Sequence, residues 1–123
     1  MTATAKRADQ QQPACEAIID ATHLARMTLG EPGLEREVLA LFDRQAEMLL
    51  PRIRRGTGAI AAATAHTLKG SALGIGAFAV ARAADAVERA DGAGLPRAID
   101  ALGEALAAAS AEIARLLRDA ARA

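Results

Sequence analysis

The chain has 123 residues, of which 52% are hydrophobic, and its 15 basic and 15 acidic residues cancel. This length suits one domain, and the balanced charge excludes the long-range positive field that nucleic-acid binding or an anionic membrane surface would require. Two phenylalanines and no tryptophan or tyrosine leave the chain poor in strand-forming aromatic residues, whereas its abundant alanine favours helix. We therefore expect an all-α domain.

The first part of the chain differs from the rest. Residues 1–15 are polar and lack periodicity, which predicts a disordered N-terminal tail ahead of a helical domain at 16–123. They contain no apolar segment typical of a signal peptide, and no stretch of about 18 apolar residues occurs without charge. We therefore expect a cytoplasmic protein. Cys15 is the single cysteine, which excludes an internal disulfide and a cysteine-based metal site.

Two helices are predicted in the first half of the domain. A short one begins at Asp20, a capping residue that follows Ile19 as a hydrophobic staple, and ends near Gly30. Pro32 opens a long second helix. Its buried stripe is assigned to Leu34, Val38, Leu41, Phe42, Gln45, Leu49 and Ile53. A narrower strip beside it, which would cover the short helix or face a partner, contains Leu39, Ala46 and Leu50.

Three more helices complete the domain. One is capped by Thr57 and runs to about Ile75, where Gly74 and Gly76 stop it. Its buried stripe is assigned to Ile60, Thr64, Leu68, Ser71 and Ile75. The next helix covers 77–90, and its buried stripe is assigned to Val80, Ala83, Ala84, Val87 and Ala90. Pro96 opens the last helix. Its buried stripe is assigned to Ile99, Leu102, Leu106, Ala109, Ile113 and Leu117. Short turns between four long helices predict an up-down four-helix bundle with a short extra N-terminal helix.

His66 lies opposite the stripe assigned to its helix, so its imidazole should face solvent. Its neighbours on that face form a flat, partly apolar surface: Ala59, Ala62, Ala63, Lys69, Gly70 and Leu73. Gly70 costs the helix about 1 kcal/mol relative to alanine. A glycine at this position is explained if a side chain there would obstruct a partner. The alternative explanation is close packing of Gly70 against another helix.

Several kinds of chemistry are excluded at the two histidines. Neither His23 nor His66 has a histidine or cysteine three or four residues away, so no metal site is expected. The sequence offers no evident acid to orient the ring as in a Ser-His-Asp site. No glycine-rich phosphate loop follows a strand, so we expect neither ATP binding nor kinase activity. The remaining possibility is that one of these histidines is a nucleophile that reacts with a group carried by another protein. Neutral imidazole offers an unprotonated nitrogen near neutral pH.

A longer motif surrounds this histidine. The string Ala65-His66-Thr67-Leu68-Lys69-Gly70-Ser71-Ala72, the later pair Gly76-Ala77 and the pair Val87-Glu88 resemble the histidine-containing phosphotransfer (HPt) domains of bacterial multistep phosphorelays. The resemblance is dense between 65 and 88. It departs from the family pattern at Gly74, where a polar residue is common, at Val87, which replaces leucine, and at Thr57 and Gly58, where an acidic residue is missing.

The resemblance implies that His66 accepts a phosphoryl group from a receiver-domain aspartate and passes it to another receiver. Lys69, one turn along, would reach the phosphoryl oxygens or be solvated. The receiver would dock on Ala62, Ala63, Gly70 and Leu73, with Phe78 beside them across the turn.

The expected partners are receiver domains of response regulators and of a hybrid histidine kinase. The resemblance places magnesium on the receiver, so this chain needs no cofactor of its own, and we expect a monomer that binds neither nucleic acid nor membranes. Two other interpretations stay open. One is a non-phosphorylated helical adaptor that uses the same surface, and the other is a substrate domain of a chemotaxis-type kinase, which is less favoured because no further domains follow.

Overall fold

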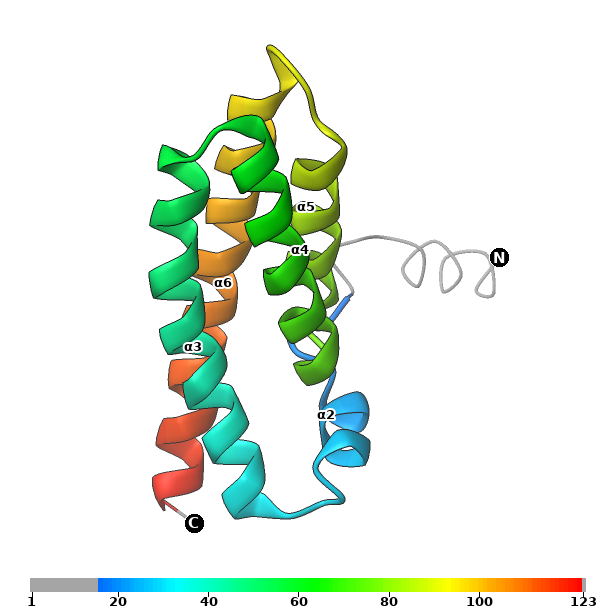
Figure 1. Ribbon diagram of the computed structural model, residues 1–123. Helices are drawn as coiled ribbons and strands as arrows, with labels where there is room; N and C mark the ends of the chain where they lie inside the picture. Colours follow the sequence, from blue (N-terminus) through cyan, green and yellow to red (C-terminus); the bar gives the residue numbers. More distant parts are fainter. Residues whose placement is uncertain (1–15, 123) are drawn as a thin grey trace, which may run out of the picture.

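The computed structural model describes residues 16–122, which form five helices and no strand. The helices are α2 (Ala21–Met27), α3 (Pro32–Arg55), α4 (Gly58–Ile75), α5 (Phe78–Arg89) and α6 (Gly94–Arg122). The last four alternate in direction as an up-down bundle, and α2 lies at the end where α3 and α6 extend beyond α4 and α5 (Figure 1). The predicted fold class is confirmed. The predicted tail at 1–15 and Cys15 lie outside the described residues.

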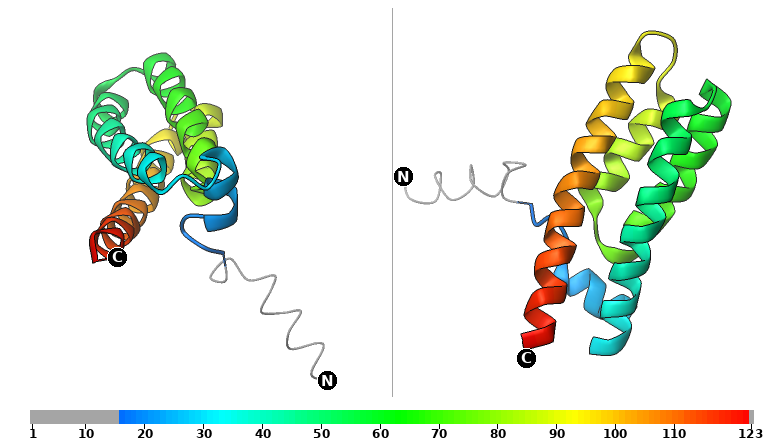
Figure 2. Two further views of the ribbon diagram at one scale, coloured as in Figure 1. Left: turned by 90° about the horizontal axis from the view of Figure 1, so that it is seen from below. Right: turned by 90° about the vertical axis from the view of Figure 1, so that its left-hand side faces the viewer.

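The order of the helices around the bundle follows from their contacts. Both α3 and α5 pack against α4 and α6, so α3 and α5 occupy diagonal corners. Two further views show α3 and α6 running side by side over most of their length (Figure 2). Within 16–122, no helix is long and apolar enough to cross a membrane.

Capping residues begin the helices largely where the sequence predicts. Asp20 Oδ1 accepts a hydrogen bond from the backbone N–H of His23 at 3.0 Å, and Thr57 Oγ1 accepts one from Ile60 at 3.5 Å. Pro32 is in the first turn of α3. The last helix begins at Gly94 rather than at Pro96, because a proline anywhere in the first turn removes an N–H that has no helical partner.

The ends of α2 and α4 differ slightly from the prediction. The helix α2 stops at Met27, before Gly30, because Leu29 and Gly30 adopt positive φ angles. Gly74 lies within α4 and does not stop it. Gly76 alone ends α4, with a left-handed φ of 80° that glycine adopts without strain.

The buried stripe assigned to α4 is wrong by a rotation of about 60°. Ile60 is 54% exposed, and Thr64 and Ser71 are only partly buried. The residues that face the core are Ala61, Ala65, Leu68, Ala72 and Ile75. Three of these are alanines, which allow the neighbouring helices to approach closely, so the larger side chains do not mark the buried face.

The same error affects α3. Leu34 and Leu41 are exposed, and Gln45 is only partly buried. The core-facing residues are Leu39, Phe42, Ala46, Leu49 and Ile53. The strip that the sequence placed beside the core therefore supplies two of the five, and its third member, Leu50, packs against the core from the edge.

The remaining helices follow the prediction more closely. In α5 the buried residues are Val80, Ala81, Ala84 and Val87, with Ala83 at the edge and Ala90 just past the helix end. In α6 they are Ile99, Leu102, Leu106, Ala109 and Ile113. Leu117 is partly buried and packs against this cluster.

The segment before α3 is fixed to the turn between α4 and α5. The backbone N–H of Asp20 donates to the carbonyl of Gly76 at 3.0 Å, and a Cβ on Gly76 would lie 3.0 Å from the Asp20 carbonyl oxygen. The ring of His23 meets Phe78 edge-on, with centroids 5.2 Å apart. Phe78, the first residue of α5, is therefore held in place from α2.

Candidate functional site

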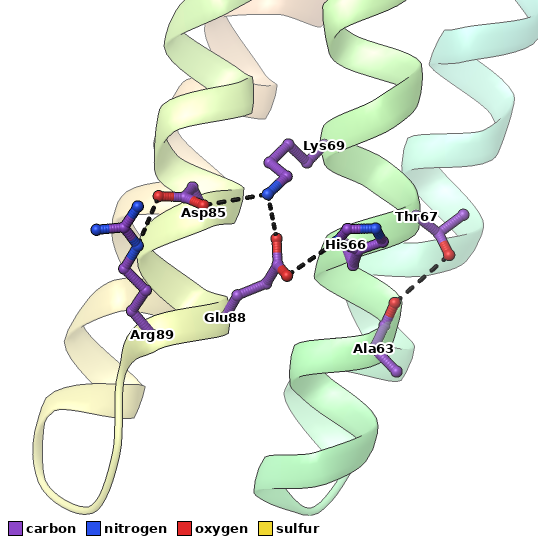
Figure 3. Close-up of polar contacts among 7 residues, drawn as sticks. All are labelled: Ala63, His66, Thr67, Lys69, Asp85, Glu88 and Arg89. Atoms are coloured by element: carbon purple, nitrogen blue, oxygen red, sulfur yellow. Dashed lines mark hydrogen bonds and ion pairs between the residues drawn. The ribbon is translucent and has the colours of Figure 1, made fainter.

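His66 projects from α4 with 68% of its side chain exposed. Its neighbours Ala65 and Leu68 are fully buried, so the packing of α4 fixes the direction of the ring. Nδ1 of the ring lies 2.9 Å from Oε2 of Glu88, which comes from α5 (Figure 3). A side chain on the neighbouring helix thus orients an otherwise exposed imidazole.

Glu88 is also the centre of a charged cluster on α4 and α5 (Figure 3). Its other oxygen, Oε1, lies 2.8 Å from Nζ of Lys69. The same ammonium lies 3.1 Å from Oδ1 of Asp85, and Oδ2 of Asp85 lies 2.9 Å from Nε of Arg89. We call these five residues the charged cluster: His66, Lys69, Asp85, Glu88 and Arg89.

The contacts shift two acid–base equilibria within the charged cluster. Hydrogen bonding with Lys69, and to a lesser extent with His66, lowers the pKa of Glu88 from its ordinary value of 4.5. Hydrogen bonding with Glu88, and then with Asp85, raises the pKa of Lys69 above 10.5. Glu88 therefore remains a carboxylate and Lys69 an ammonium throughout the neutral range.

The ionised state of Glu88 determines which ring nitrogen of His66 is available. A carboxylate only accepts hydrogen bonds, so Nδ1 of a neutral ring must carry the proton and donate it to Glu88. The lone pair then resides on Nε2, which makes no hydrogen bond within residues 16–122. An exposed ring with Nε2 unprotonated is suited to nucleophilic attack on a group brought by a partner.

The expectation that no carboxylate orients the ring is wrong, because Glu88 does so. The sequence did contain the signal. The helices α4 and α5 are antiparallel and joined by Gly76 and Ala77, and positions 66 and 88 are equally distant from this turn to within one residue. Two residues equidistant from a tight helix–helix turn lie level with each other, so the spacing brings Glu88 level with His66, and the rotation of the two helices decides whether they meet.

Lys69 is neither free in solvent nor isolated, because two carboxylates hold it on the α5 side of α4. The sequence predicts either contact with a phosphoryl group or solvation for Lys69, and the structure shows a third arrangement. It places a positive charge one helical turn from His66, with Glu88 between the two side chains (Figure 3).

Few side chains project from the surface of α4 near His66. A Cβ added to Gly70 would meet nothing within 4 Å, so close helix packing does not explain this glycine and that alternative is wrong. Ala63 and Leu73 are exposed, and Ala62 is partly buried. Ala62, Ala63 and Gly70 thus leave the ring with small neighbours on the side of α4 away from Lys69.

A groove runs between α4 and α5 next to this surface. It is lined by Lys69, Leu73, Phe78, Ala81, Arg82 and Asp85. The structure therefore brings together Leu73, Phe78 and Lys69, as the sequence predicts, and the remaining predicted residues Ala62, Ala63 and Gly70 lie on α4 outside the lining. Arg82, at the edge of the groove, forms an ion pair with Glu16.

The other histidine has no comparable site. His23 packs its ring against Phe78, and its side chain makes no ion pair among the residues that the structure describes. Over 16–122, no group of three or more histidine, cysteine, aspartate or glutamate residues is arranged to hold a metal ion.

The chain matches the family model of the Hpt domain over residues 37–112. The match covers more than half of the chain and includes His66, Lys69 and Glu88, so the chain belongs to the Hpt family. Domains of this family carry out histidine phosphotransfer in phosphorelays and interact with the receiver domains of response regulators. Comparisons with curated proteins and with solved structures gave no match.

Proposed function

We propose that this chain is a phosphorelay intermediate in which Nε2 of His66 accepts a phosphoryl group from the aspartate of one receiver domain and passes it to the aspartate of another. The observation that carries the proposal is the 2.9 Å contact between Nδ1 of His66 and Glu88. It leaves Nε2 as the unprotonated nitrogen of an exposed ring, in a chain that belongs to the Hpt family.

The transfer needs no external proton. In the forward step, Nε2 attacks the phosphorus of the aspartyl phosphate, the N–P bond forms, and the P–O bond to the aspartate breaks, which returns a carboxylate to the receiver. The Nδ1 proton stays on the ring, which becomes positively charged. Glu88 accepts the hydrogen bond from that proton and stabilises the charge. The reverse sequence, with a second aspartate as nucleophile, restores neutral His66.

Lys69 has two roles in this scheme. Its ammonium holds Oε1 of Glu88 at 2.8 Å, which fixes the carboxylate opposite the ring. It also places a positive charge near a phosphoryl group on Nε2, where it lowers the energy of the developing negative charge. Asp85 keeps Lys69 on the α5 side of the helix, 3.1 Å away.

The receiver docks on the surface around His66, where few side chains project. Its aspartate has to approach Nε2 closely and in line, which requires small neighbours such as Ala62, Ala63 and Gly70. The adjoining groove offers Leu73 and Phe78 as apolar contacts. The receiver contributes the magnesium ion, so this chain holds no cofactor, and receivers of response regulators and of a hybrid histidine kinase serve as donor and acceptor.

Short incubations with individual phosphorylated receiver domains test the proposal. Acid-labile, alkali-stable phosphate should appear on the wild-type chain and disappear from the receiver. His66→Gln should abolish this transfer while its helicity and melting temperature stay close to those of the wild type, because substitutions of exposed residues shift stability by about 0.5 kcal/mol or less. Phosphate acceptance by His66→Gln would exclude His66, and receiver binding without any transfer would favour the helical adaptor instead.

A further inference from the structure

The outer side of α3 carries a row of large apolar side chains that the bundle formed by residues 16–122 leaves exposed. Leu34 is 39% exposed, Leu41 is 59% exposed and Met48 is 56% exposed. Their spacing of seven residues places them along one face of the helix, displaced by about 20° per step. We call these three residues the α3 stripe. It is separate from the charged cluster, which lies on α4 and α5.

Charged residues accompany the α3 stripe on one side. Glu37 and Arg44 are also seven residues apart, and neither forms an ion pair within residues 16–122. Together with Leu34 and Leu41 they line a shallow groove that reaches Leu117 of α6. An apolar row flanked by opposite charges of this kind is typical of a surface that receives another helix.

The pattern is complementary to itself. In an antiparallel pair of α3 helices related by a two-fold axis near Leu41, Leu34 of one copy faces Met48 of the other, since each is seven residues from 41. The same axis sets Glu37 opposite Arg44 in both directions. The midpoints of the two pairs, 41 and 40.5, differ by half a residue, or about 0.75 Å along the helix. Apolar and ionic contacts thus form in one register.

We propose that the α3 stripe binds a second copy of this chain, giving an antiparallel two-fold dimer through α3. This departs from the monomer expected from the sequence. The helix α5, which orients His66 through Glu88, is diagonal to α3 in the bundle. Each copy therefore keeps the α5 side of its phosphotransfer site away from the dimer contact, and the proposal is independent of the chemistry at His66.

Sedimentation analysis of the full chain, from micromolar to millimolar concentration, tests the proposal. The wild type should convert from monomer to dimer as concentration rises. Leu41→Asp should remain monomeric because it places like charges at the two-fold axis. The control Leu73→Asp, an exposed leucine of α4 outside the α3 stripe, should dimerise like the wild type, and circular dichroism should show that both variants are folded.

Charge reversal tests the antiparallel register. Glu37→Arg and Arg44→Glu should each raise the dimer dissociation constant by at least about tenfold, because each replaces two attractions with two repulsions. The double variant should return it to within about threefold of the wild type. A wild-type chain that is monomeric at every concentration would overturn the proposal, and so would a dimer whose dissociation constant is the same in the charge-reversal variants. A chain that stays monomeric, and in which Leu41→Asp weakens only receiver binding, would also overturn the proposal.

Discussion

The two histidines of this chain show how neighbouring residues set the role of a side chain. His66 is exposed and has a carboxylate 2.9 Å from Nδ1, whereas His23 is partly buried with its ring against Phe78. The exposed position of His66 follows from helical periodicity. The contact with Glu88 depends on the α4–α5 turn, so it can be predicted only once both helices and their joining residue are placed.

At the scale of single residues, Glu88 is predicted to position the ring of His66. Glu88→Ala should slow phosphoryl transfer by about 10- to 100-fold, because the ring loses its fixed tautomer and orientation. Glu88→Gln, whose amide oxygen still accepts from Nδ1, should retain more activity. Rapid-quench transfer from one phosphorylated receiver measures both rates. Equal rates for the wild type and Glu88→Ala would contradict a positioning role.

The lowered pKa of Glu88 predicts a pH dependence of stability. A carboxyl whose folded-state pKa lies below its unfolded value stabilises the fold above the unfolded pKa, and this stabilisation disappears as pH falls through the folded pKa. In a His66→Gln background, which removes titration of the ring, Glu88→Gln should therefore destabilise the protein near neutral pH. Denaturant unfolding should show the difference shrinking below about pH 4.5. A difference that stays constant into strong acid would refute the linkage.

At the scale of the helix, α4 combines a buried alanine face with an open face around His66. Five buried residues fix its rotation, and three of them are alanines. The sequence predicts the length and caps of α4 well. Its rotation is predicted less well, because large apolar side chains usually mark the buried face of a helix, whereas alanine is buried here because it is small.

The rotation of α4 is tested by two neighbouring substitutions. Leu73→Asp alters an exposed residue, so it should change the free energy of unfolding by about 0.5 kcal/mol or less while weakening receiver binding. Ile75→Asp puts a charge into the core, where Ile75 is 5% exposed, and should unfold the bundle. Thermal melts followed by circular dichroism distinguish the two. A folded Ile75→Asp and an unfolded Leu73→Asp would mean that the assigned rotation is wrong.

Gly70 is predicted to keep the approach to His66 open. Gly70→Gln should stabilise α4 by up to about 1 kcal/mol, since glycine is the poorer helix former, yet slow transfer from a receiver by about tenfold or more. Gly74→Gln is a matched control, because a Cβ there also meets nothing within 4 Å and the residue lies two turns from His66. Equal transfer rates for the two variants would show that Gly70 has no special effect.

In the whole molecule, the bundle brings together residues that are distant in sequence, such as His66 and Glu88. The buried alanines allow close packing, and α2 fixes the α4–α5 turn through Asp20 and Gly76. Composition, turn residues and apolar periodicity are sufficient to predict this architecture from the sequence. The groove between α4 and α5 is less predictable, because it depends on how far apart two helices lie and on where His23 holds Phe78.

In the proposed mechanism, Nε2 of His66 carries the phosphoryl group while Nδ1 donates its proton to Glu88. The most direct measurement is nuclear magnetic resonance of the ¹⁵N-labelled chain after phosphorylation by a receiver. We expect phosphorus coupling at Nε2 of His66 and a protonated Nδ1. Phosphate bound to Nδ1, or to any residue other than His66, would contradict this mechanism.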